Sequence, residues 1–169
     1  MADYYSPTVI QQRIPVADIT PLERLLLSHI FDAEPDGDGL YFYAEESPAN
    51  ITALNRAELD TALAASEAFT SSLNAYVSER LADLPTDEDT ILLDLSFTSW
   101  EFIFQDIVRR STSLRYITAV SSFTCSKMRP DAFGGMAVLI TPAAVIGKST
   151  TDLIEEFLSE AGLDGAAQV

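Results

Sequence analysis

The sequence has few of the side chains on which metal sites and disulfides depend. Its 169 residues include one cysteine, Cys125, and one histidine, His29. A single cysteine excludes a disulfide within the chain and a zinc site built from several cysteines. A single histidine likewise excludes a histidine-rich metal site. We therefore expect no metal and no cofactor, with Cys125 as a reduced thiol.

Long hydrophobic runs are also missing. The longest strongly apolar stretch without a charge is 132–147, and it is interrupted by Gly134, Gly135, Pro142 and Gly147. A bilayer-spanning helix needs about 20 consecutive apolar residues. The N-terminus has neither the basic region nor the apolar region of a secretory signal. These absences predict a cytoplasmic protein that makes no contact with membranes.

Positive charge is scarce. There are 10 Lys and Arg against 26 Asp and Glu, which gives a formal net charge of −16. The phosphate backbone of nucleic acids and anionic lipid surfaces both repel such a chain. Direct binding to nucleic acid is therefore not expected as the main function.

Apolar residues are abundant enough for a folded core. They make up 47% of the chain, charged residues make up 21%, and no linker, repeat or low-complexity tract interrupts the pattern. A chain of this length is typical of one domain. We predict a single domain over residues 1–169, with flexible ends at 1–7 and 163–169.

The first half of the chain has clear signals for helices. Thr20, Pro21 and Glu23 form a capping box that predicts a helix to about Phe31. Asn55 predicts the start of a helical segment over 56–82, either one helix or two with a break near Thr70 and Ser71. Strands are expected at 9–16, 40–44 and 90–95, and a turn is expected at 32–39.

The second half alternates helix and strand signals. Thr98 and Glu101 form a capping pair for a helix that ends near Arg110. Strands at 114–125 and 135–141 are close enough to pair in antiparallel fashion. A last helix starts at Ser149 or Thr150, and four of its residues are expected to face the core: Leu153, Ile154, Phe157 and Leu158. The predicted fold class is α+β, with a mixed or mainly antiparallel sheet of about four strands packed against about four helices.

Two segments resemble ligand-binding loops. Residues 142–149 precede the last helix and end in Gly147-Lys148-Ser149, like a phosphate-binding loop, but proline stands at the first glycine position. Residues 34–45 place acids at calcium-loop spacing, but a strand pattern follows where a helix is required. We interpret the first segment as a turn with a helix cap and the second as an acidic turn.

Neither Cys125 nor His29 has the partners that catalysis requires. Lys127 and Arg129 could lower the pKa of the Cys125 thiol, but nothing in the sequence brings His29 to it as a base. Acidic pairs are too common to mark a general acid and base. We therefore assign no catalytic residue and expect a protein that is not an enzyme.

The charges are unevenly distributed along the chain. Residues 107–149 contain six bases and one acid, between two acidic segments. Neutralisation of these bases by neighbouring acids on folding is one interpretation. The other is an anion-binding patch within 109–148, made of Arg109, Arg110, Arg115, Lys127 and Arg129.

The acidic surplus favours binding to a macromolecule. A negative surface can imitate a nucleic-acid backbone and occupy a basic groove. Proteins that phages and plasmids use against host defence systems are similar in size and charge, although no family motif is present. The residues expected to form this partner-binding face are Glu58, Asp60, Glu67, Glu79, Asp83, Asp87, Glu88 and Asp89.

The leading hypothesis is therefore an acidic interaction protein that binds and inhibits or regulates a protein partner, with a nucleic-acid-binding protein as one such partner. Two alternatives stay open. One is a small enzyme or anionic-ligand-binding domain that uses the basic segment. The other is an acidic structural domain that forms homo-oligomers through exposed strands.

Overall fold

A computed structural model describes residues 2–96 and 99–163 of the chain. Its helices are the short 3-10 helix η1 (Val16–Asp18) and the α-helices α1 (Pro21–Ile30), α2 (Arg56–Ser66), α3 (Ser72–Ala82), α4 (Trp100–Arg110) and α5 (Thr150–Glu160). Its strands are β1 (Tyr4–Tyr5), β2 (Thr8–Ile10), β3 (Ile14–Pro15), β4 (Asp32–Asp36), β5 (Gly39–Ala44), β6 (Ile51–Asn55), β7 (Thr90–Asp94), β8 (Ile117–Cys125), β9 (Gly134–Ile140) and β10 (Val145–Ser149).

The strands form one large sheet and one small sheet. The large sheet has eight strands in the order β10-β9-β8-β2-β5-β3, with β1 added to β8 and β4 added to β5. β6 and β7 form a separate pair, and all pairings in both sheets are antiparallel. The α+β class is as predicted. The prediction of about four strands and about four helices is wrong, because the described residues contain ten strands and five α-helices.

Several of the missed strands lie at sheet edges and lack an apolar pattern. The expected turn at 32–39 is a hairpin in which the acidic strand β4 pairs with the apolar strand β5. Gly37, at φ 61°, makes the turn between them, a left-handed conformation that favours glycine. Because β4 gains its stability from hydrogen bonds to β5, its own exposed side chains give no strand signal.

The segment that resembles a phosphate-binding loop also forms a strand. Val145–Ser149 is β10, which pairs with β9 along its whole length. The backbone N–H groups of a strand in a ladder do not converge on one point, as those of a phosphate-binding nest do. The Ser149 hydroxyl instead accepts a hydrogen bond from the N–H of Asp152 and caps α5.

The local signals for helix starts and strand pairing are confirmed elsewhere. Thr20 and Glu23 form the capping box of α1. The segment 56–82 contains two helices, because the chain breaks before Ser71, which caps α3. β8 and β9 pair in antiparallel fashion, as predicted. Thr98 lies outside the described residues.

The hydrophobic core lies between the helices α1–α4 and the inner face of the large sheet. Phe42 of β5 and Phe104 of α4 are fully buried, with ring centroids 5.7 Å apart. Phe31, which follows α1, joins this aromatic cluster through an edge contact with Trp100. Leucines of α1 and isoleucines of α4 fill the space around the rings. Together these side chains fix the helices on the sheet.

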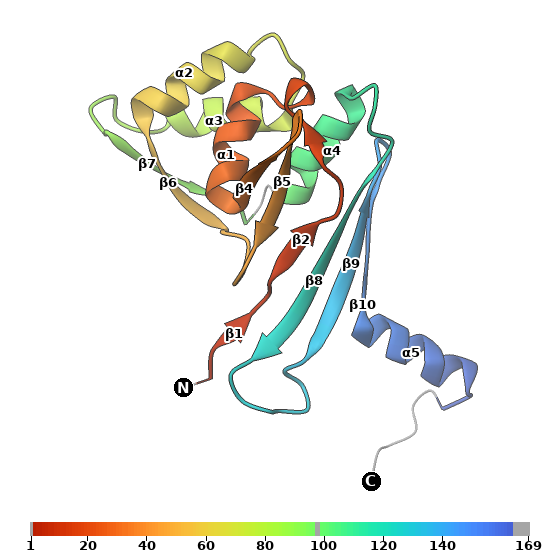
Figure 1. Ribbon diagram of the computed structural model, residues 1–169. Coiled ribbons are helices and arrows are strands. Elements are labelled where there is room, and N and C mark those ends of the chain that lie inside the picture. The colour runs from red at the N-terminus through yellow and green to blue at the C-terminus, as the bar shows by residue number, and fades with distance from the viewer. Residues whose placement is uncertain (1, 97–98, 164–169) are drawn as a thin grey trace.

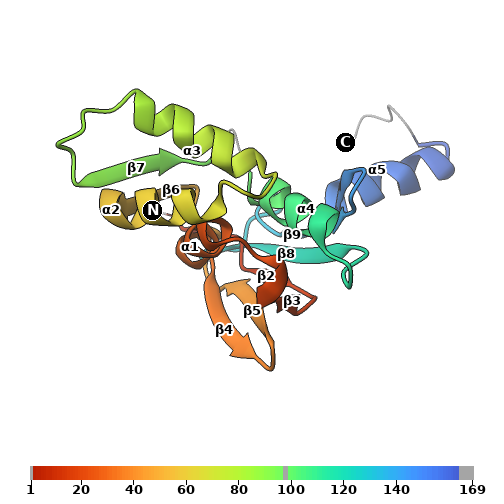
Figure 2. The same cartoon turned by 90° about the horizontal axis from the view of Figure 1, so that it is seen from above.

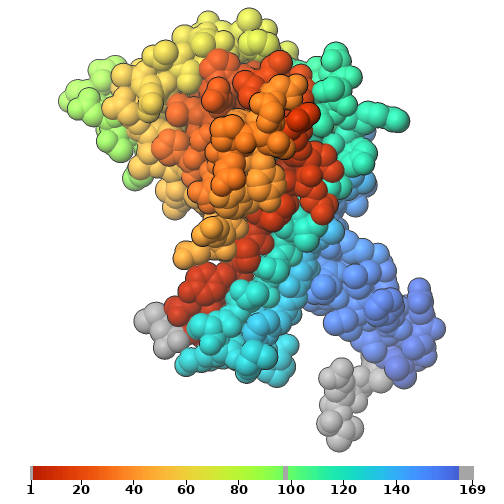
Figure 3. Space-filling model, in the orientation of Figure 1, coloured from red at the N-terminus to blue at the C-terminus, as the bar shows by residue number. Residues whose placement is uncertain are grey.

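Part of the large sheet extends beyond this core. Strands β8, β9 and β10 run out from the helical body as an arm, and α5 lies at its far end (Figures 1 and 2). The space-filling view shows α5 projecting from the side of this arm (Figure 3). The prediction that Leu153, Ile154, Phe157 and Leu158 face the core is therefore wrong, since no residue of α5 is buried.

Candidate protein-interaction surfaces

The start of α5 is held by a capping box. The carboxylate of Asp152 accepts hydrogen bonds from the backbone N–H of Ser149, at 2.6 Å, and from its hydroxyl, at 2.7 Å. These two bonds, in that order of importance, lower the pKa of Asp152 below its ordinary value. Lys148 forms an ion pair with Glu156 one turn further on. The first two turns of α5 are thus stabilised without any contact to the core.

The apolar face of α5, formed by Leu153, Ile154 and Phe157, is uncovered. These side chains are 38%, 57% and 61% exposed. They fall at the i, i+1 and i+4 positions of one helix face, and the acids Asp152, Glu155 and Glu156 occupy the remaining circumference. Among the described residues, the helix packs mainly against β9 and β10. α5 therefore has the pattern of a helix that buries one face, yet no described residue covers that face.

The outer face of the arm adds to this apolar surface. Along β8 and β9, residues that point inward are buried, whereas Val120 and Leu139 on the opposite face are exposed. Val9 of β2 lies beside Val120, and Ile146 of β10 lies beside Leu139. A shallow hollow of about 260 Å³ is lined by Val120, Leu139 and Ile146, among other residues. No helix covers this face within the described residues.

A large hollow lies between α1 and α2. This α1–α2 groove has a volume of about 930 Å³ and opens to solvent. Its apolar walls come from η1, α1 and α2, namely Val16, Ile19, Pro21, Leu25, Ala62 and Ala65. Its size is at the upper end of the range of ligand pockets, about 300–1,000 Å³.

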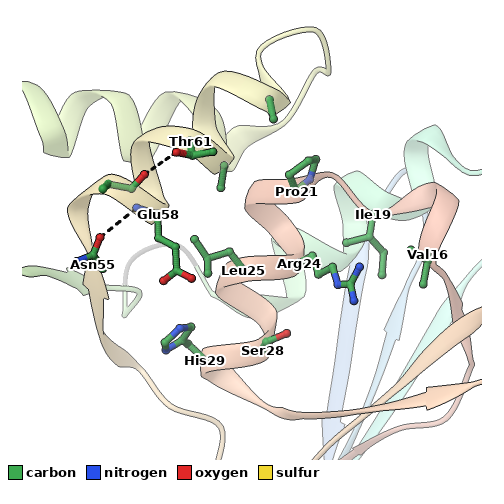
Figure 4. Close-up of a pocket in the computed structure, with 13 residues that line it drawn as sticks. Val16, Ile19, Pro21, Arg24, Leu25, Ser28, His29, Asn55, Glu58 and Thr61 are labelled. Carbon is green, nitrogen blue, oxygen red and sulfur yellow. Dashed lines mark hydrogen bonds between the residues drawn. The ribbon is translucent and has the colours of Figure 1, made fainter.

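The groove has different charges at its two ends. Arg24 lies near Ile19 at one end, and Glu58 and His29 lie at the other (Figure 4). Asn55 accepts a hydrogen bond from the backbone N–H of Glu58 and so fixes the start of α2. Neither Glu58 nor His29 has a side-chain partner among the described residues, which leaves them without the third group that orients a catalytic base.

The elements that carry the acids predicted to bind a partner lie at the end of the molecule opposite α5. Glu58 and Asp60 are on α2, Glu67 follows that helix, Glu79 is on α3, and the remaining four follow α3 (Figures 1 and 2). We call these eight residues the acidic surface. All of them are exposed, and none forms an ion pair with a described residue.

Two bases of the predicted anion-binding patch are used inside the fold. Arg109 donates hydrogen bonds to Asp106, Gln105 and the carbonyl of Pro142. Arg110 donates to the buried carboxylate of Glu23 and to the Thr70 carbonyl. Both arginines hold α4 to its neighbours.

The other three bases of that patch lie at opposite ends of β8. Arg115 precedes the strand, while Lys127 and Arg129 follow it. Nine residues of extended strand separate them by roughly 30 Å. The structure therefore does not bring the five predicted bases around one anion.

The remaining candidate residues stay apart. Cys125 is buried at the end of β8, and His29 lies in the α1–α2 groove. In residues 2–96 and 99–163, no three His, Cys, Asp or Glu side chains are grouped so that they could hold a metal ion. No helix in the same ranges is long and apolar enough to cross a membrane.

The apolar face of α5 was not predicted from the sequence to be an interaction surface. The signal was present as the spacing of Leu153, Ile154 and Phe157, but this spacing is the same for a core helix and for an unpartnered one. The α1–α2 groove has no sequence signal, because its walls come from segments that are about 40 residues apart in the chain.

Comparisons with protein families, with curated proteins and with solved structures find no match to this chain.

Proposed function

We propose that the chain is an interaction protein that docks onto other protein surfaces through the apolar face of α5 and the neighbouring outer face of the arm. The observation that carries this proposal is the exposure of Leu153, Ile154 and Phe157 on a helix with no buried residue. An amphipathic helix at the end of an arm suits helix-in-groove recognition.

Leaving this apolar surface in water costs free energy. Burying one large apolar side chain stabilises a protein by about 1.5–3 kcal/mol. Contiguous exposed apolar residues on a protein mark interaction sites, whereas scattered ones do not. Leu153, Ile154 and Phe157 lie within about one turn of the same helix, and all three are exposed. A partner that covers them gains this free energy.

An anion-binding enzyme has less support. Arg109 and Arg110 are committed to internal hydrogen bonds, and the remaining bases are split between the two ends of β8. The α1–α2 groove contains His29 and Glu58, but neither has a side-chain partner within the described residues, and those residues contain no metal-ligand cluster.

The acidic surface supports a second candidate function, in which the protein occupies the basic groove of a nucleic-acid-binding protein. Its eight acids are exposed and free of ion pairs with described residues. Unpaired charges gathered on one side of a molecule give the extended negative potential that such mimicry requires. This surface lies at the opposite end from α5, so the two binding modes are compatible.

Site-specific photo-crosslinking in the cells that produce the protein tests the α5 proposal. A photoreactive residue at Ile154 should give discrete covalent adducts with protein. The same residue at Glu155, on the acidic side of the same helix, is the matched control and should give few. The substitution Phe157→Asp should remove the adducts at position 154, because it places a charge in the centre of the buried contact.

Equal crosslinking from positions 154 and 155 would contradict the proposal, since it would mean that the helix is not bound by one face. Adducts that persist in the Phe157→Asp variant would do the same.

A further inference from the structure

Two surfaces of the molecule, the apolar face of α5 and the α1–α2 groove, match each other in polarity. We infer that the apolar face of α5 binds in the α1–α2 groove of a second copy of this chain, so that copies join head to tail. This inference rests on the proposed docking role of α5 and names its partner.

The two surfaces are complementary in polarity. Ile154 and Phe157 project from α5 one turn apart, and the groove offers an apolar hollow of about 930 Å³. Ala62 and Ala65 on the α2 wall are small, which leaves room for large side chains from outside. An amphipathic helix whose i and i+3 or i+4 residues enter an apolar groove is a recurrent mode of protein recognition.

The charges fix the direction of the helix in the groove. Glu160 lies one turn after Phe157 and borders the apolar face, and it forms no ion pair with a described residue. Arg24, at the end of the groove near Ile19, is likewise without an ion-pair partner among the described residues. Placing Glu160 at Arg24 also keeps this acid away from Glu58 at the other end of the groove (Figure 4).

The contact has to form between copies rather than within one chain. α5 is held to β9 and β10 at the far end of the arm, and α1 and α2 belong to the helical body at the other end (Figure 1). Since β10 pairs with β9 along its full length, the arm cannot fold back without breaking that ladder.

A helix that binds a different surface on the next copy makes a heterologous contact. Such contacts repeat, and they form a closed ring or an open filament according to the rotation between neighbours. Each copy then uses both its groove and its α5. The acids of the acidic surface on α3 and the following loop do not line the groove and stay available to another partner, whereas Glu58 lies in the groove.

The experiment measures association of the full chain by sedimentation velocity across a concentration series, using two variants. Phe157→Asp damages α5 and leaves the groove intact. Ala65→Trp fills the groove from an exposed position on α2 and leaves α5 intact. Ala64→Trp, at the neighbouring exposed position that does not line the groove, is the matched control. Circular dichroism of every variant checks that each remains folded.

We expect the wild-type chain and Ala64→Trp to associate as concentration rises. Phe157→Asp and Ala65→Trp should each associate about 10- to 100-fold more weakly, the ratio that corresponds to one large apolar side chain. An equimolar mixture of the two weak variants should form a dimer, because one supplies an intact groove and the other an intact α5. A chain that carries both substitutions should not restore association when it is mixed with either single variant.

A wild-type chain that stays monomeric throughout the series would overturn the inference, as would a mixture that shows no dimer while the wild type associates. Neither result tests the proposed docking role of α5, which is tested separately by crosslinking at position 154. If the adducts form while the chain is monomeric, α5 binds a different protein.

Discussion

The buried carboxylate of Glu23 connects three helices at a single residue. It accepts hydrogen bonds from the N–H of Thr20 and from the Ser71 hydroxyl, both at 3.0 Å, and it forms an ion pair with Arg110. These partners belong to the starts of α1 and α3 and to the end of α4. Its side chain is fully buried, so water cannot replace any lost partner.

The substitution Glu23→Gln should lower the free energy of unfolding by about 3 kcal/mol, because it leaves the Arg110 charge largely buried without a counter-charge. Urea unfolding followed by circular dichroism measures this change. The control Glu45→Gln removes the same charge from an exposed position and should change stability by less than about 0.5 kcal/mol. Equal losses in the two variants would show that the buried pair contributes nothing specific.

At the scale of the element, α5 depends on its cap because it has no core contacts. The bonds from Ser149 favour the ionised form of Asp152 and hold its pKa below the ordinary value. A group with a lowered pKa in the folded state stabilises that state at pH values above its ordinary pKa, about 3.9. That contribution is lost as the pH falls through the lower pKa of the folded helix.

Asp152→Asn should therefore cause faster amide hydrogen exchange across 150–160 at neutral pH, by severalfold, with little change in the helical body. The wild-type helix should lose the same protection when the pH falls below about 4. Hydrogen exchange read by mass spectrometry, corrected for the intrinsic pH dependence, measures both effects. Glu155→Gln removes one charge from the same helix without touching the cap. If it increases exchange as much, charge rather than capping explains the result.

At the scale of the whole molecule, the elements that carry the acidic surface lie at one end and the uncovered apolar face of α5 at the other (Figure 1). Unpaired like charges repel one another and destabilise the compact state, although they also keep the surface hydrated. Retaining such a cluster lowers stability. A binding function of the acidic surface would explain why the chain retains these charges despite their cost in stability.

Neutralising four of its acids, Glu79→Gln, Asp83→Asn, Asp87→Asn and Glu88→Gln, should raise the melting temperature by a few degrees at low salt. The gain in melting temperature should be smaller at about 0.5 M NaCl, because the Debye length there is less than about 5 Å and the repulsion between these charges is screened. If the acidic surface binds a basic groove, the same variant should also lose any partner that high salt releases from the wild type. The control, Asp36→Asn, Glu45→Gln, Glu46→Gln and Asp131→Asn, has the same net charge and should keep that partner.

Much of the architecture follows from short-range rules that act within a few residues. Thr20 and Glu23 predict the start of α1, and the alternating pattern of 114–125 predicts the strand that the structure shows as β8, Ile117–Cys125. The acidic strand β4 could not be found in this way. Its stability comes from backbone hydrogen bonds to β5, and these do not depend on its own side chains.

The chemistry of α5 was readable from its residues: a serine cap, an apolar stripe and an acidic side. Whether that stripe is buried depends on the position of β10, which carries α5 beyond the reach of the core. The α1–α2 groove similarly exists only because the hydrogen bond from the Leu22 N–H to the Ser66 hydroxyl and the core leucines hold α1 beside α2. Local sequence sets which face of a helix is apolar, since helical periodicity is a property of neighbouring residues. Tertiary structure decides what covers that face, because burial depends on segments that are distant in the chain.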